Sequence, residues 1–107
     1  MSVRDPSPSE PTAGFSGDAA GARWSYTGAL TFANASRVFA AAAAMPLPST
    51  GEVDLSGADA VDSSAVAVLL ALARRARAEG KPLAFTRVPA ALRALADLYS
   101  VEDLLTA

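Results

Sequence analysis

Residues 53–73 read VDLSGADAVDSSAVAVLLALA, and this stretch decides the fold. Apolar and polar residues alternate from Glu52 to Ser56, which predicts a half-buried β-strand. Residues 57–60 are predicted to form a loop. An aspartate and two serines, which favour helix N-termini, then precede an unbroken apolar run. This pattern predicts a long helix from Ala65 to Glu79.

Strands and helices alternate on both sides of this segment. Pro46 and Pro48 end the preceding helix, and Gly80 stands where a helix C-terminus is expected. The other predicted elements are strands at 23–27 and 30–32, a helix at 35–45, a strand at 83–86, a helix at 90–99 and a short turn at 100–105. This order indicates an α/β fold with a small mixed, largely parallel β-sheet and helices packed on it.

The chain has 107 residues, which suits one small domain. Residues 1–21 contain three prolines and three glycines and offer little apolar surface to offset the entropy of ordering. We therefore expect a disordered N-terminal tail at 1–21 and a folded domain at 22–107.

The sequence contains no cysteine and no histidine. This excludes disulfides, zinc sites built on those ligands and a Ser-His-Asp triad. Asp54, Asp59 and Asp62 suit Mg²⁺ as ligands, but no glycine-rich phosphate loop accompanies them. We expect a protein that is not an enzyme, with no catalytic residue, no metal and no cofactor.

The formal net charge is −2, and the charges balance from Arg23 onward. Since nucleic-acid binders usually carry a basic excess, this balance argues against such a partner. The sequence shows no signal peptide and no apolar run as long as a membrane span. We expect a cytoplasmic protein that reaches a membrane only through a partner.

The long helix is apolar on more than one side. At about 100° per residue, its sheet-facing side is predicted to carry Val66, Leu69, Leu70, Ala73 and Arg77. The other side carries Ala67, Val68, Ala71, Leu72, Arg75 and Ala78. Two interpretations stay open: an alanine-rich helix partly tucked under a neighbouring helix, or a surface that docks on another protein.

Three polar residues, Asp62, Ser63 and Ser64, precede this helix, although one residue suffices as a cap. A phosphoryl group on Ser63 or Ser64 would be stabilised by the helix N-terminus. The same serines are also common before helices for purely structural reasons.

The segments 53–56, 61–66 and 69–70 resemble the signature of STAS domains, a family that includes antagonists of anti-sigma factors. Its usual pattern is a strand ending in Asp-Leu-Ser, a short loop, and Asp-Ser-Ser-Gly or Asp-Thr-x-Gly opening a helix. The resemblance extends from about residue 22 to the end. It implies the STAS fold and a role in binding proteins.

Within that family the chain is similar to MlaB-like subunits in residues 28–35, in its minimal length and in the ending at 95–105. The resemblance implies that its partner is the ATPase subunit (MlaF-like) of an Mla-type phospholipid ABC transporter. The domain would support that ATPase during intermembrane phospholipid transport, which maintains outer-membrane lipid asymmetry. It would be cytoplasmic and peripheral to the inner membrane through its partner.

Ser63 falls where MlaB-like proteins carry Thr or Ser, and Ser64 where the antagonists carry their phosphorylated serine. The alternative is therefore an anti-sigma factor antagonist, phosphorylated by an anti-sigma factor kinase. Ala65 replaces the family's glycine, which puts very close approach by a kinase in doubt.

The predicted partner-binding residues are Asp62, Ser63, Ser64, Ala65, Ala67, Val68, Ala71, Leu72 and Arg75. If the Leu72 side of the helix is exposed, Leu72→Asp is expected to abolish ATPase binding while the fold survives.

Overall fold

The computed structural model describes residues 13–99. Its elements are, in order, β1 (Gly14–Gly17), β2 (Arg23–Leu30), α1 (Ala35–Ala43), β3 (Glu52–Val61), α2 (Ser63–Ala78), β4 (Ala84–Thr86) and α3 (Ala90–Leu98). The strands form one sheet in the order β1-β2-β3-β4, with β1 antiparallel to β2 and the pairs β2–β3 and β3–β4 parallel. The predicted small, mixed and largely parallel α/β sheet is confirmed.

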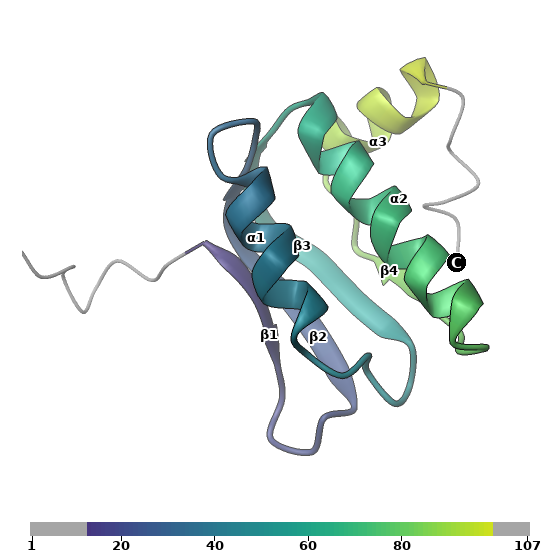
Figure 1. Cartoon of the computed structure of the whole chain (residues 1–107). Helices are drawn as coiled ribbons and strands as arrows, with labels where there is room; N and C mark the ends of the chain where they lie inside the picture. The colour runs from purple at the N-terminus through teal and green to yellow at the C-terminus, as the bar shows by residue number, and fades with distance from the viewer. Residues whose placement is uncertain (1–12, 100–107) are drawn as a thin grey trace, which may run out of the picture.

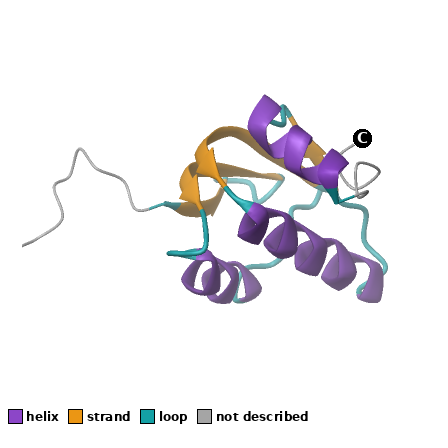
Figure 2. Cartoon of the chain, turned by 90° about the horizontal axis from the view of Figure 1, so that it is seen from above, coloured by secondary structure: helices purple, strands orange, loops and turns teal. Residues whose placement is uncertain are grey.

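Two helices cover one face of this sheet. α1 and α2 lie side by side in front of it, and α3 lies near the N-terminal half of α2 (Figure 1). Seen from above, the strands lie behind the layer of α1 and α2 (Figure 2). The hydrophobic core fills the space between these layers. The strands contribute to it the buried side chains of Trp24, Tyr26, Val53, Leu55 and Phe85.

The N-terminal boundary of the domain differs from the prediction. Residues Gly14–Gly17, predicted to belong to the tail, form β1 and pair with β2. The ring of Phe15 lies 5.5 Å from that of Trp24 and 4.7 Å from that of Tyr26, measured between centroids. The aromatic packing across the two strands outweighs the glycine-rich composition, from which we had predicted a tail.

Two predicted breaks in the strands are absent. β2 continues through Gly28, where we predicted a turn before a second short strand, and β3 continues through the predicted loop at 57–60. The β2–β3 register shifts near both places. A side chain on Gly57 would collide with the backbone oxygen of Tyr26, so this glycine permits close strand approach rather than a loop.

The ends of α2 agree better with the sequence. The helix begins at Ser63, two residues before the predicted start, because Asp62 is its N-cap. At the other end Gly80 has a left-handed φ of 67°. The N–H of Gly80 donates to the carbonyl of Arg77, and the N–H of Lys81 donates to the carbonyl of Ala76. These bonds satisfy carbonyls of the last turn, as is typical of helices that end at a glycine. The turn predicted at 100–105 lies outside the described residues.

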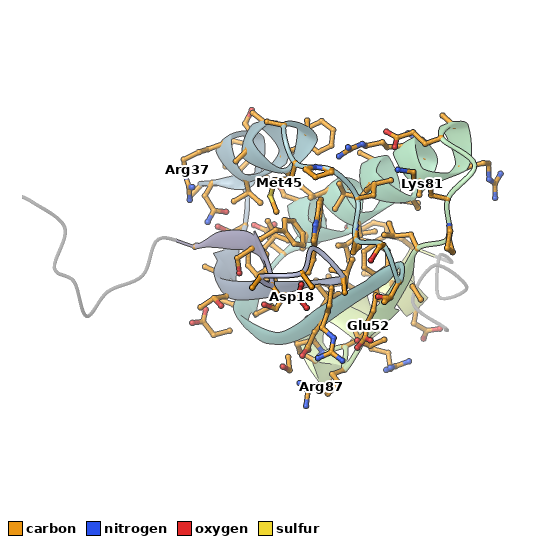
Figure 3. The ribbon with its side chains drawn as sticks, turned by 90° about the horizontal axis from the view of Figure 1, so that it is seen from below. Asp18, Arg37, Met45, Glu52, Lys81 and Arg87 are labelled. Carbon is orange, nitrogen blue, oxygen red and sulfur yellow. The ribbon has the colours of Figure 1, made fainter. Side chains whose placement is uncertain are left out.

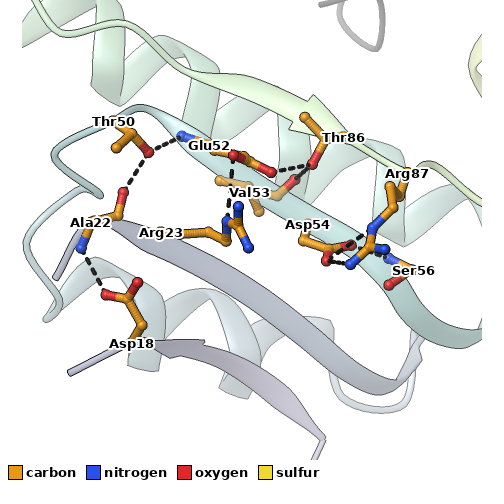
Figure 4. A network of polar contacts seen from close by, with 10 residues as sticks. All are labelled: Asp18, Ala22, Arg23, Thr50, Glu52, Val53, Asp54, Ser56, Thr86 and Arg87. Carbon is orange, nitrogen blue, oxygen red and sulfur yellow. Dashed lines mark hydrogen bonds and ion pairs between the residues drawn. The ribbon is translucent and has the colours of Figure 1, made fainter. Parts of the chain in front are cut away.

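The sheet face opposite α1 and α2 carries an ion pair. Asp54 of β3 is buried, accepts the backbone N–H of Ser56 and pairs with the guanidinium of Arg87 (Figure 4). Figure 3 shows Glu52 and Arg87 on this side, away from Arg37 of α1. Hydrogen bonding from Arg87 lowers the pKa of Asp54 well below its ordinary value of 3.8, and burial opposes this only in part. Arg87 itself has a left-handed φ of 52°, which the ion pair helps to hold.

Asp54→Asn is expected to lower the free energy of unfolding at neutral pH by about 2 kcal/mol, because a charge-assisted hydrogen bond is lost. A folded-state pKa below the unfolded value stabilises the fold above pH 3.8, and this contribution disappears as the pH falls further. The difference between wild type and variant should therefore shrink in acid. Urea unfolding across acidic pH values measures it. The exposed Asp59, on the same strand, supplies the control Asp59→Asn, and an equal loss there would contradict a specific role for Asp54.

Candidate functional site

Asp62 joins two segments at one end of the helix layer. Its Oδ1 accepts the backbone N–H of Ser64 at 2.8 Å, which caps α2. Its Oδ2 accepts the backbone N–H of Phe32, in the β2–α1 loop, at 2.9 Å. The hydrogen bond from Phe32, and next that from Ser64, lower the pKa of the Asp62 carboxyl. Asp62 therefore remains a carboxylate at neutral pH and connects the start of α2 to the loop before α1.

Because Asp62 caps α2, neither serine hydroxyl is needed for that purpose. Ser63, the first residue of α2, is exposed and lines the same groove as Tyr99 at the end of α3. Ser64 is half-buried and lines the groove that α2 forms with α1. The structure thus separates two residues that the sequence presents as a pair, and phosphorylation of either one stays a prediction.

The predicted outer face of α2 is wrong for two of its residues, Val68 and Leu72, which are only 5% and 0% exposed. Ala65, predicted to contact a partner, is also buried, with no exposed surface. The buried set on α2 comprises Ala65, Val66, Val68, Leu69, Leu72 and Ala76. This set spans a wide arc because α2 packs against both the sheet and α1. The true outer stripe contains the exposed Ser63, Ala67, Arg74 and Arg77, flanked by the partly buried Leu70 and Ala71.

Arg75 was predicted as a charged rim, and the structure gives it a different role. Its guanidinium donates to the carbonyl oxygens of Ala42 at 3.2 Å and Met45 at 2.7 Å, and pairs with Glu79 at 2.9 Å. α1 has no basic residue in its own last turn. Arg75 therefore supplies the positive charge that the C-terminus of α1 lacks and ties α1 to α2.

Arg75→Ala is expected to lower the free energy of unfolding by about 2 kcal/mol, because two carbonyl acceptors at the end of α1 lose a charged donor. Arg74→Ala removes the same group from the exposed stripe one residue earlier and should cost less than about 0.5 kcal/mol. Urea denaturation of both variants measures this difference in the free energy of unfolding. Equal stabilities would mean that the contacts of Arg75 with α1 contribute nothing measurable.

Two apolar grooves flank the outer stripe of α2. The groove between α1 and α2, of about 350 Å³, lies between Phe32 and Phe39 on one side and Ser64, Ala67 and Ala71 on the other. The groove between α2 and the end of α3, of about 370 Å³, is lined by Ser63, Val66, Ala67, Leu70 and Tyr99. Ala67 belongs to both. We call these two grooves and the stripe between them the docking surface.

Large apolar side chains stand exposed around the docking surface. Phe32 is 86% exposed and Tyr99 51%. Sequence reasoning missed Phe32, because it was assigned to a strand, and Phe39, because its helical spacing suggested the core. Exposed aromatic residues beside apolar grooves are typical of surfaces that bind other molecules.

Within residues 13–99 the structure brings no three Asp, Glu, His or Cys side chains together as metal ligands. Of the three aspartates considered for Mg²⁺, Asp54 is paired with Arg87 and Asp62 caps α2, whereas Asp59 is exposed on β3. Among the same residues no helix has the length and apolar character needed to span a membrane.

The profile of a known family, described as Mlab, STAS domain, matches residues 14–106. The match begins at the first residue of β1 and includes the whole docking surface. No curated protein matches the chain.

Proposed function

Because the chain belongs to the STAS domain family, we propose that it is a non-catalytic subunit that docks on the ATPase of an Mla-type phospholipid ABC transporter. The family description, which names Mlab, and the MlaB-like features of the sequence support this choice of partner. The chain would then be cytoplasmic and peripheral to the inner membrane through that partner.

The observation that carries the proposal is the docking surface itself. A helix that only covered a sheet would present charged side chains outward, but the first half of α2 presents Ser63 and Ala67 between two apolar grooves. Asp62 hydrogen-bonds both the start of α2 and the loop before α1 at this end of the domain. A surface whose backbone is already hydrogen-bonded suits binding because less entropy is lost on association.

The test is an affinity purification of the tagged protein from its native host, with bound proteins identified by mass spectrometry. Recovery of an ABC-type ATPase together with its permease is the expected result. Recovery of a kinase-like anti-sigma factor, with no transporter subunit, would overturn the proposal.

The second candidate function is an anti-sigma factor antagonist regulated by serine phosphorylation. The exposure of Ser63, and the freedom of both hydroxyls from capping, support it. A phosphoryl group on Ser64 would stand beside the Asp62 carboxylate, which opposes it by like-charge repulsion. Intact-mass measurement of the protein from its host, across growth phases, tests this candidate, since only a regulated antagonist should gain a phosphoryl group.

A further inference from the structure

We propose that the element of the partner that binds the docking surface is an amphipathic helix, which lies in the groove between α1 and α2, packs against Phe32 and places an acidic residue opposite Arg74. This inference rests on the proposed function and specifies the chemistry of the ATPase segment involved. Three features of the helix layer carry it: an exposed aromatic residue on a hydrogen-bonded loop, small side chains that line the groove, and exposed arginines on α2.

Phe32 is an exposed aromatic residue on a loop whose backbone is held by hydrogen bonds. Its backbone N–H is bound by Asp62. The side chain of Asn34 accepts the N–H of Thr31 at 3.0 Å and donates to the carbonyl of Ala29 at 2.9 Å, which closes the loop on itself. Because the backbone of this loop is already hydrogen-bonded, the 86% exposed side chain of Phe32 can enter a partner's surface without the cost of ordering the loop.

The groove beside Phe32 is shaped for a helix. Small side chains from both helices, Ala35 and Ser36 from α1 and Ala67 and Ala71 from α2, line it. Small residues let two helix backbones approach to about 8 Å, at the close end of helix packing distances. The open groove lies between two helices, so a third helix laid along it would contact both.

The charges on the two helices have one sign. α1 and α2 contain no acidic residue, and their charged residues are Arg37, Arg74, Arg75 and Arg77. Arg75 is engaged with α1 and Glu79, whereas Arg74 and Arg77 are exposed and form no ion pair within residues 13–99. Asp62 carries a negative charge at the start of α2, so the uncompensated positive charge lies toward the other end of the helix, and a carboxylate of the partner complements the surface best there.

Arg74 also fixes where such a carboxylate belongs. It follows Ala67 by seven residues, which is two helical turns, so both lie on the same outer stripe of α2 at about 10 Å spacing along the axis. The partner helix should therefore present apolar or small residues opposite Ala67 and an acidic residue about two turns further along.

An anionic membrane surface shares part of this chemistry, since arginine and exposed aromatic residues also suit lipid headgroups. The geometry favours the protein helix, because the apolar lining lies inside a groove, whereas a bilayer presents a flat surface. The experiment therefore also measures binding to membranes.

The experiment measures the affinity of the purified Mla-type ATPase from the same organism for wild type, Phe32→Ala and Arg74→Glu. Matched controls are Leu98→Ala, an exposed apolar residue at the end of α3, and Arg93→Glu, an exposed arginine on α3. Phe32→Ala and Arg74→Glu should each weaken binding about tenfold or more, and the controls should not. The Arg74→Glu defect should shrink at about 1 M salt, where charges are screened within about 3 Å.

If Phe32→Ala and Arg74→Glu both bind the ATPase with the affinity of wild type, this inference is overturned but the proposed function is retained. Absence of binding by the wild type would remove the proposed function as well. Sedimentation with phosphatidylglycerol vesicles is the remaining readout: co-sedimentation of wild type that Phe32→Ala abolishes would assign Phe32 to a membrane and overturn the helix. Restoration of Arg74→Glu binding by an acidic-to-lysine change in the ATPase would establish the pair.

Discussion

Leu72→Asp is expected to unfold the domain. Leu72, a residue of α2, has no exposed surface and packs in the hydrophobic core. The change removes a buried leucine, which contributes about 1.5–3 kcal/mol, and adds a carboxylate whose burial costs several kcal/mol more. A small domain is stable by only about 5–15 kcal/mol, so this loss consumes most or all of the stability.

The measurement is a thermal unfolding curve by circular dichroism together with the yield of soluble protein. The variant should lack a cooperative transition near that of wild type. This result would also explain a loss of ATPase binding without any contact between Leu72 and the partner. A folded Leu72→Asp protein with the wild-type melting temperature would contradict the burial of this side of α2.

Ala67→Glu should have the opposite pattern, a folded protein that no longer binds the ATPase. Ala67 is exposed and lines both grooves of the docking surface. Glutamate is a good helix former, so α2 should remain intact. Its carboxylate would be buried without a partner in the complex, at a cost of about 3 kcal/mol or more, which weakens binding by at least about 100-fold.

Co-purification with the ATPase measures this effect, and a melting curve verifies the fold. The matched control is Ala94→Glu, an identical change at an exposed position of α3. Ala94→Glu should bind like wild type. If Ala67→Glu also binds like wild type, the partner lies elsewhere on the domain and the docking surface has another use.

The sequence predicted the architecture well because its strongest signals are local. Alternation marked β3, Asp62 marked the start of α2, and Gly80 marked its end, each through the preferences of a few neighbouring residues. The strand–helix alternation then limited the fold to a largely parallel sheet. The family signature lies within the same segment.

The predictions were wrong or incomplete where the local structure depends on contacts between segments far apart in the sequence. β1 is four residues with two glycines, and it forms because Phe15 packs against two aromatic rings of β2. The continuation of β3 through residues 57–60 depends on close approach of β2 at Gly57. The ion pair of Asp54 joins residues 33 positions apart, which no local pattern reveals.

The candidate site divides in the same way. Asp62, Ser63, Ser64, Ala67 and Ala71 were predicted from the sequence and do line or border the docking surface. The local patterns of the sequence were thus sufficient for the α/β fold and the family, and they placed the candidate site at the start of α2. The tertiary structure alone decided which side of α2 faces outward. Residues 65–73 of that helix are apolar all round, so their periodicity carries no orientation. Only the packing of α2 against the rest of the domain buries Val68 and Leu72 and leaves Ala67 exposed.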